Sequence, residues 1–107
     1  MWNWLEAWWA GKPYCERASG WRPLRKAHLE AHPCCEMCGR RDNVVPHHKL
    51  PVHLFPQFEL DPENLITLCE NAINCHLLAG HLGLYSSYNP NCEEDVELWH
   101  KKLEERP

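Results

Sequence analysis

The chain lacks a hydrophobic run that could cross a membrane. Charged residues or prolines interrupt every candidate before it reaches the roughly 18 apolar residues of a transmembrane helix. The opening residues, Met-Trp-Asn-Trp-Leu-Glu, also lack the basic and apolar regions of a secretory signal. We therefore expect a soluble cytoplasmic protein without a membrane partner.

The chain is also too short to gain a wide margin of stability from burial alone. Its 107 residues are the size of one domain, and a domain this small is often held together by metal ions or disulfides. An odd number of cysteines, seven, argues against a fully paired disulfide scaffold. We predict a single domain over residues 1–107 that is stabilised by a bound metal ion.

Positive charge is missing from one part of the chain. Residues 50–92 contain no Lys or Arg and four acidic residues, a net charge of −4. Residues 12–49 contain eight Lys and Arg and four acidic residues, a net charge of +4. The total of −4 argues weakly against a polyanionic partner, but a segregated basic segment can bind one. An ordinary solvated charged surface is an equally weighted alternative.

Hydrophobic periodicity predicts several helices. The first is rich in tryptophan, and the second is amphipathic, with a basic outer face and an end before Pro33. A further helix follows the last of the central cysteines, and another closes the chain. The predicted ranges are 2–10, 21–32, 75–84 and 91–105.

The helix predicted at 91–105 has residues typical of helix ends as well as a row of apolar residues on one side. We expect Asn91 to cap it, because acidic residues fill its first turn and lysines its last, as the helix dipole favours. Val96, Trp99 and Leu103 should form its buried line.

Two short strands are predicted between the helices, at 43–49 and 64–69. Pro46 lacks an N–H donor and should lie at an edge or a bulge. The proline-rich loop between the strands, 50–63, is long enough to suggest a purpose. The expected fold class is therefore α+β, with flanking N-terminal and C-terminal helices.

The cysteine spacing predicts a structural zinc site. Cys35-x2-Cys38 followed by Gly39 has the spacing of a zinc knuckle, and Cys69-x5-Cys75 returns to it after both strands. Closing the chain between the knuckles costs about 3 kcal/mol, whereas structural zinc supplies roughly 10–16 kcal/mol in small peptides. Buried free thiols are the less favoured alternative. Three cysteines have no predicted role in this site: Cys15, Cys34 and Cys92.

These motifs, taken in order, resemble the HNH endonuclease family. Cys-x2-Cys, His47-His48, Asn-Leu-x2-Leu-Cys starting at Asn64, and Cys75-His76 follow one another as in its zinc-stapled branch. The similarity covers about residues 35–81. It implies a ββα-metal core, within residues 34–84, preceded by a helical lead-in, residues 1–33.

The resemblance also implies roles for individual residues. His48 would be the general base that activates water, and Asn64 would fix the loop and orient that base. His47 and His76 would bind a catalytic divalent ion. Independently, phosphodiester hydrolysis needs a base that titrates near neutral pH and a cation facing the developing negative charge, and histidine and a divalent ion meet these needs.

One position departs from the family pattern. Some relatives have a third imidazole four residues after the last ligand, but here Gly80 occupies that place and His81 is one residue further on. His81 is therefore a candidate third ligand. The positions of His47 and His48 need a further condition if both are to face one phosphate. Adjacent residues of a regular strand point to opposite faces, so the strand must be twisted, bulged or ending there.

The predicted metal chemistry follows from the ligands. His47 stands where many relatives have an acidic residue, so the site is rich in nitrogen and should favour Mn²⁺, Co²⁺ or Ni²⁺ over Mg²⁺.

The expected partner is DNA, bound mostly through its phosphates. One active site per chain favours nicking, by a monomer or a weak dimer. The resemblance also suggests a bacterial or phage-encoded intracellular protein. Alternatives are a zinc-stapled binding module for nucleic acid or protein without catalysis, and a subunit of a larger assembly. The candidate phosphate contacts are Arg22, Arg25, Lys26, Arg40, Arg41 and Lys49.

Overall fold

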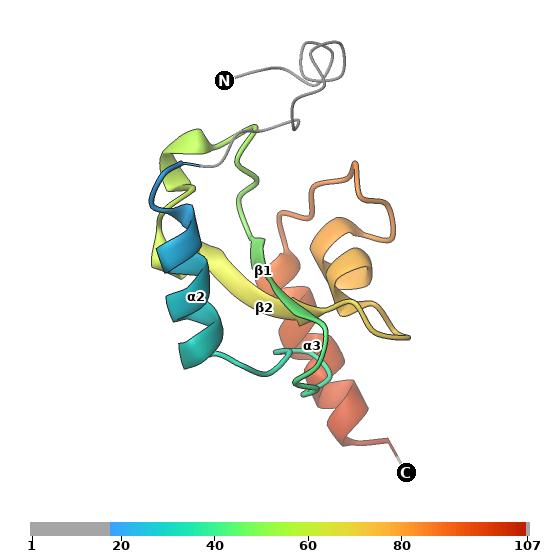
Figure 1. Ribbon diagram of the computed structural model, residues 1–107. Coiled ribbons are helices and arrows are strands. Elements are labelled where there is room, and N and C mark those ends of the chain that lie inside the picture. Colours follow the sequence, from blue (N-terminus) through green and yellow to red (C-terminus); the bar gives the residue numbers. More distant parts are fainter. Residues whose placement is uncertain (1–17, 107) are drawn as a thin grey trace.

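The computed structural model describes residues 18–106 and shows a small α+β protein (Figure 1). The helix expected at 2–10, and Cys15, lie outside this range. None of the helices within it has both the length and the apolar character needed to cross a bilayer. The elements are α2 (Trp21–Ala31), β1 (Val44–His48), 3₁₀-helices at Pro56–Phe58 and Pro62–Asn64, β2 (Leu65–Cys69), a π-helix at His76–Gly80, and α3 (Cys92–Glu104).

The two expected strands form an antiparallel pair at the centre of the molecule. Val44 pairs with Cys69 and His48 with Leu65. Every residue of β2 is buried, because α2 lies on one side of the pair while the π-helix and α3 lie on the other (Figure 1). A two-stranded ribbon is marginal alone, so these helices are needed to stabilise it.

Pro46 lies on an edge strand, one of the two positions predicted for it, because over residues 18–106 the sheet has only the strands β1 and β2. The strand is regular there, without a bulge. Pro46 pairs in register with Thr67, whose N–H donates to the Glu36 carboxylate and whose carbonyl accepts from the Glu36 N–H. The backbone groups of Thr67 therefore point away from β1. Pro46 and Thr67 are therefore a non-hydrogen-bonded pair of the antiparallel ribbon, in which the residue opposite Thr67 donates no N–H to β2. A proline at this position costs the ribbon no hydrogen bond.

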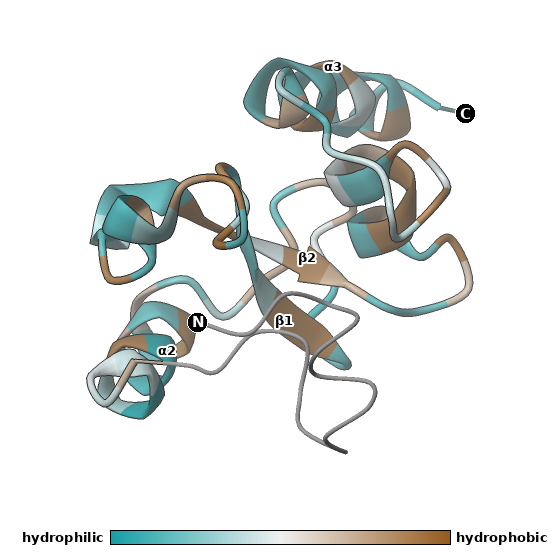
Figure 2. Ribbon diagram, turned by 90° about the horizontal axis from the view of Figure 1, so that it is seen from above, coloured by the Kyte–Doolittle hydropathy of each residue, from teal (hydrophilic) through white to brown (hydrophobic). Residues whose placement is uncertain are grey.

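The core lies between β2 and the C-terminal half of the chain. Met37, Ile66, Leu68, Ala79 and Val96 pack together there with buried cysteine side chains. Figure 2 shows hydrophobic residues along the strands and a mostly hydrophilic α3. The core is small, so covalent or metal cross-links should contribute much of the stability.

The structure corrects two expectations about α3. Asn91 occupies the N-cap position, as predicted, but its side chain makes no capping hydrogen bond. The side-chain oxygen Oδ1 of Asn89 accepts from the Asn91 N–H at 3.0 Å. Trp99 is 39% exposed and lies beneath the Lys102 ammonium instead of in the core. The side chains that face the core from α3 are Cys92, Val96 and Leu103.

Candidate metal centres

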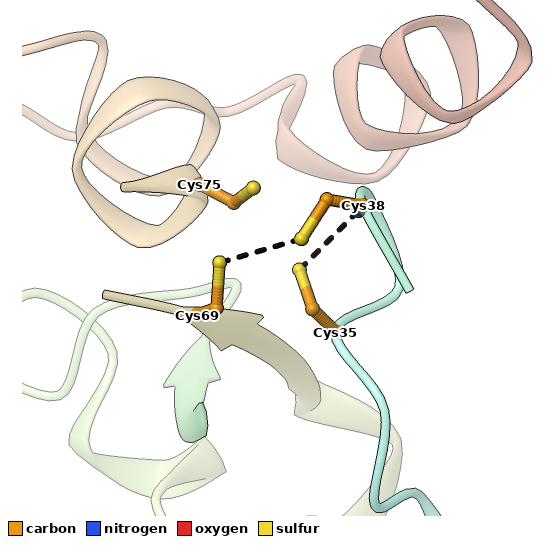
Figure 3. Close-up of side chains that lie close together, drawn as sticks. All are labelled: Cys35, Cys38, Cys69 and Cys75. Atoms are coloured by element: carbon orange, nitrogen blue, oxygen red, sulfur yellow. Dashed lines mark hydrogen bonds between the residues drawn. The ribbon is translucent and has the colours of Figure 1, made fainter. Parts of the chain in front are cut away.

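Four cysteine sulfurs converge where three segments of the chain meet. Cys35 and Cys38 come from the turn after α2, Cys69 ends β2, and Cys75 begins the helical turn that contains the π-helix (Figure 3). The four Sγ atoms lie within 4.8 Å of one another, and those of Cys38 and Cys69 are 3.5 Å apart. Both predicted knuckles are therefore brought together.

This arrangement fits tetrahedral zinc. A Zn–S bond of about 2.3 Å places sulfurs about 3.8 Å apart in a tetrahedron, within the observed spread. Gly39, at φ +84°, turns the backbone directly after the first knuckle, as its spacing predicts. The Cys38 and Gly39 N–H groups donate to the Cys35 sulfur and carbonyl, which fixes the knuckle.

The electrostatics of the four thiols favour a bound cation. Burial raises the pKa of Cys38, and burial together with the nearby Cys35 thiol raises that of Cys75 strongly. Burial also opposes ionisation of Cys69, but backbone N–H groups of Asn71 and Cys75 point at its sulfur and lower its pKa to about 7. Several thiolates cannot coexist in this space unless a metal ion compensates their charge.

The two other described cysteines stay outside the cluster. The Cys34 sulfur accepts from the Arg41 Nε–H at 3.4 Å, on the surface. Cys92 is buried in the core, where burial raises its pKa to about 12. Neither has the surroundings of a metal ligand.

A second cluster contains three imidazoles, His47, His76 and His81. Each ring offers one nitrogen, and these nitrogens lie within 4.8 Å of one another. The His76 Nε2 atom is 3.1 Å from His47 Nδ1 and 3.2 Å from His81 Nε2. Three nitrogens bound at about 2.1 Å to one ion would lie about 3.0–3.4 Å apart, so this spacing fits a shared metal ion.

Packing within the cluster lowers the pKa of two of its imidazoles, His47 and His76. Burial and the neighbouring His76 and His81 rings lower the pKa of His47 to about 3. Burial also lowers the pKa of His76, although Glu70 opposes the shift. Neutral imidazoles have the free lone pairs that metal binding needs.

The π-helix explains how His81 joins the cluster despite its spacing. A π-helix closes i→i+5 hydrogen bonds, so the residue five positions after His76 takes the place that an α-helix gives to the fourth. The fourth position, Gly80, lies against the rings: an added Cβ would be 3.2 Å from both His47 Cε1 and His76 Cδ2. Glycine at 80 and a π-turn together admit the third imidazole.

His48 lies beside this cluster but points its ring elsewhere. Its Nε2 is 2.9 Å from the Glu59 carbonyl oxygen, which can only accept, so Nε2 carries the proton and Nδ1 the lone pair. The Trp21 ring packs against it with centroids 4.7 Å apart. A cavity of about 550 Å³ is lined by His47, His48 and His81, so the doublet reaches one space although its members have different partners.

Asn64 holds the loop between the strands. Its Oδ1 accepts from the Leu50 N–H at 2.8 Å, and its Nδ2 donates to the carbonyls of Leu50 and Phe58. Phe58 precedes Glu59, whose carbonyl accepts from His48. Asn64 therefore fixes the part of the loop that leads directly to the carbonyl contacted by His48.

The candidate phosphate contacts differ in their surroundings. Arg25 alone among them lines a cavity of about 460 Å³ that His47, His48 and His76 also line. Arg22 and Lys26 are exposed on α2. The other three have local partners: Arg40 pairs with Asp42, Arg41 contacts Cys34, and Lys49 is 3.7 Å from Glu93.

Comparison with protein-family models, with curated proteins and with solved structures found no match to this chain. The assignment of a role to these centres therefore rests on their geometry.

Several residues at the site carry no signal in the sequence. Glu59 contributes a backbone carbonyl, which any residue has. Trp21 lies in the helix predicted at 21–32, but the pattern that predicts this helix does not indicate that its ring packs on His48. Glu70 and Tyr85 contact each other and His76, and only the position of Glu70 directly after a cysteine ligand could have indicated it.

We predict that the four-cysteine cluster binds one zinc ion per chain and that the fold depends on it. Cys69→Ser should lose this zinc and the cooperative unfolding transition, because structural sites of this kind supply much of the folding free energy. Cys34→Ser is the matched control and should keep both. Elemental analysis and thermal unfolding measure this, and a fully zinc-loaded, stable C69S protein would contradict it.

The buried His47 predicts a pH dependence of stability. Its pKa of about 3 in the folded state lies below the ordinary value of 6.5, so the unfolded chain binds a proton that the folded chain refuses. Unfolding free energy should therefore fall between pH 7 and 5.5, by about 1 kcal/mol from this group in the absence of added divalent ions. Urea unfolding of the wild type and of His47→Asn at both pH values checks it. Equal pH slopes would show that His47 does not contribute.

Proposed function

We propose that this chain is a metal-dependent DNA endonuclease of the HNH type, with a ββα-metal core. The supporting observation is the convergence of three imidazole nitrogens: His76 Nε2 is 3.1 Å from His47 Nδ1 and 3.2 Å from His81 Nε2. These three histidines and His48 all line the cavity of about 460 Å³. Three candidate metal ligands beside a separate histidine can supply the cation and the base that phosphodiester hydrolysis needs.

His48 is the general base in this proposal. The Glu59 carbonyl holds the Nε2 proton, so Nδ1 takes a proton from a water molecule as the water oxygen attacks phosphorus. The same carbonyl then stabilises the imidazolium that forms, because it faces the ring edge that carries positive charge. As the new P–O bond forms, the P–O bond to the leaving sugar oxygen breaks.

The three imidazoles would hold the divalent ion, which supplies positive charge opposite the phosphate and the leaving oxygen. Their remaining role is to fix its place relative to His48. His47 and His48 are consecutive in β1, so their separation is set by the strand itself and does not depend on a mobile loop.

Arg25 is the best placed of the cationic side chains to bind the substrate. It lines the same 460 Å³ cavity as the histidines, where a guanidinium can contact a phosphate next to the scissile one. Phosphate contacts of this kind position DNA without reading sequence. With one such centre per chain, each encounter cuts one strand.

We predict that His48→Ala lowers plasmid nicking by about 100-fold or more, because a lost general base typically costs 10²–10⁴ in rate. His32→Ala, an exposed histidine at the end of α2, is the control and should retain activity. The variant should keep its zinc and its divalent-ion binding, measured in parallel. Unchanged nicking by H48A would refute the base, and no nicking by the wild type would favour the binding module.

We also predict that Mn²⁺, Co²⁺ or Ni²⁺ supports nicking better than Mg²⁺. An all-imidazole ligand set suits later first-row ions, whereas Mg²⁺ prefers oxygen ligands. Titration of each ion against supercoiled plasmid, with zinc retained in the four-cysteine cluster, measures the preference. Equal or greater activity with Mg²⁺ would show that this ligand set does not control the choice of ion.

A further inference from the structure

A carboxylate faces the outer edge of one candidate metal ligand. The Glu70 Oε2 atom is 3.4 Å from His76 Nδ1, while His76 Nε2 points the other way, toward His47 and His81. The contact is long for a hydrogen bond, and it joins a His76 side chain that is 17% exposed to a Glu70 side chain that is 42% exposed. The ring is therefore held between an acceptor and the cluster.

A tyrosine and an asparagine hold the Glu70 carboxylate in place. The Tyr85 hydroxyl donates to Glu70 Oε2 at 3.3 Å and accepts from Asn74 Nδ2 at 3.3 Å. Asn74 is itself fixed, because its Oδ1 accepts from the Leu77 N–H. The Tyr85 ring also packs on His76 and His81, with centroids 5.7 and 5.2 Å apart.

The knuckle sequence brings these partners together. Glu70 directly follows Cys69, and His76 directly follows Cys75. When the two sulfurs converge, their chain neighbours converge as well, on the side of the histidine cluster. The long gap of five residues between the cysteines leaves room for the Glu70 carboxylate to return to His76, and the Glu70 N–H is anchored on the Asn43 carbonyl at 2.8 Å.

We propose that Glu70 is a positioning residue for the histidine centre, locked by Tyr85, and that it fixes His76 with its proton on Nδ1 and its lone pair on Nε2. This inference rests on the proposed metal-binding role of the cluster. A carboxylate behind an imidazole ligand orients the ring and makes it a stronger donor. The ring of His81 also has an acceptor behind it, but an uncharged one: its Nδ1 is 3.0 Å from the Ser87 carbonyl oxygen.

Glu70 also changes the charge of the centre. It is the one carboxylate among the described residues that line the 460 Å³ cavity, where the candidate ligands are all imidazoles. Its negative charge lies behind His76, where it strengthens attraction for a divalent cation while leaving the space for ligands unchanged. The centre therefore has a carboxylate that acts through an imidazole.

The test uses the full, zinc-loaded chain and two measurements on Glu70→Ala and Glu70→Gln. Long-range proton–nitrogen NMR without added divalent ion reports the His76 tautomer, which should be Nδ1–H in the wild type and should shift toward Nε2–H in E70A. Calorimetric titration with Ni²⁺ alone should show an affinity about 10-fold to 100-fold weaker in E70A. Tyr85→Phe should show a smaller loss, and Glu97→Gln, an exposed carboxylate on α3, should show none.

The outcomes separate the two proposals. An unchanged His76 tautomer in E70A would overturn the positioning role, whatever the protein's activity. If Ni²⁺ bound E70A as tightly as the wild type, the role in metal binding would also be excluded. If the wild type bound no Ni²⁺ at the histidines, the proposed function would fail, while a tautomer shift in E70A would still establish the contact with His76.

Discussion

The convergence of four cysteine sulfurs is the constraint on which the rest of the structure depends. It joins the turn after α2, the end of β2 and the start of the π-helix, three segments that a two-stranded ribbon could not hold together alone. The same convergence builds the histidine centre, because Glu70 and His76 directly follow Cys69 and Cys75 in the chain. The dipeptides Cys69-Glu70 and Cys75-His76 thus link the two sites, because each supplies a sulfur to the first and a side chain to the second or its surroundings. A displacement of these sulfurs would therefore also displace His76.

The π-helix is the second structural device at the centre. A regular α-helix from His76 would place Gly80 beside the ligand and direct His81 away. The wider turn brings His81 into the cluster, where its ring lies 4.9 Å from that of His47 and 4.8 Å from that of His76. Carbonyl groups near the end of this turn need other partners, and the Asn89 side chain donates to the Ala79 carbonyl at 2.7 Å. Asn89 also donates to Asp95 and so fastens the turn to α3.

Local patterns made much of this arrangement predictable. Both strands, the helix at 21–32, the final helix and the two knuckles follow from periodicity and spacing, which act over a few residues. The errors arose where tertiary packing decides. Trp99 fits the apolar side of α3 but lies outside the core, and the side chain of Asn91, although this residue is the N-cap, makes no capping hydrogen bond. The membership of His81 depended on the i→i+5 turn. Glu70 was missed because its contact depends on the path of a loop that sequence spacing does not fix.

The charge distribution connects the histidine centre to the proposed substrate. The chain carries a net charge of −4, and the cavity at the histidines has one arginine, Arg25, and one carboxylate, Glu70, among the described residues that line it. Burial lowers the pKa of His47 and His76, so these two imidazoles add no positive charge near neutral pH. A bound divalent ion would therefore supply most of the local positive charge. On the proposed function, the ion is then needed to attract the phosphate as well as to assist its cleavage, and DNA affinity and catalysis should depend on the same three ligands.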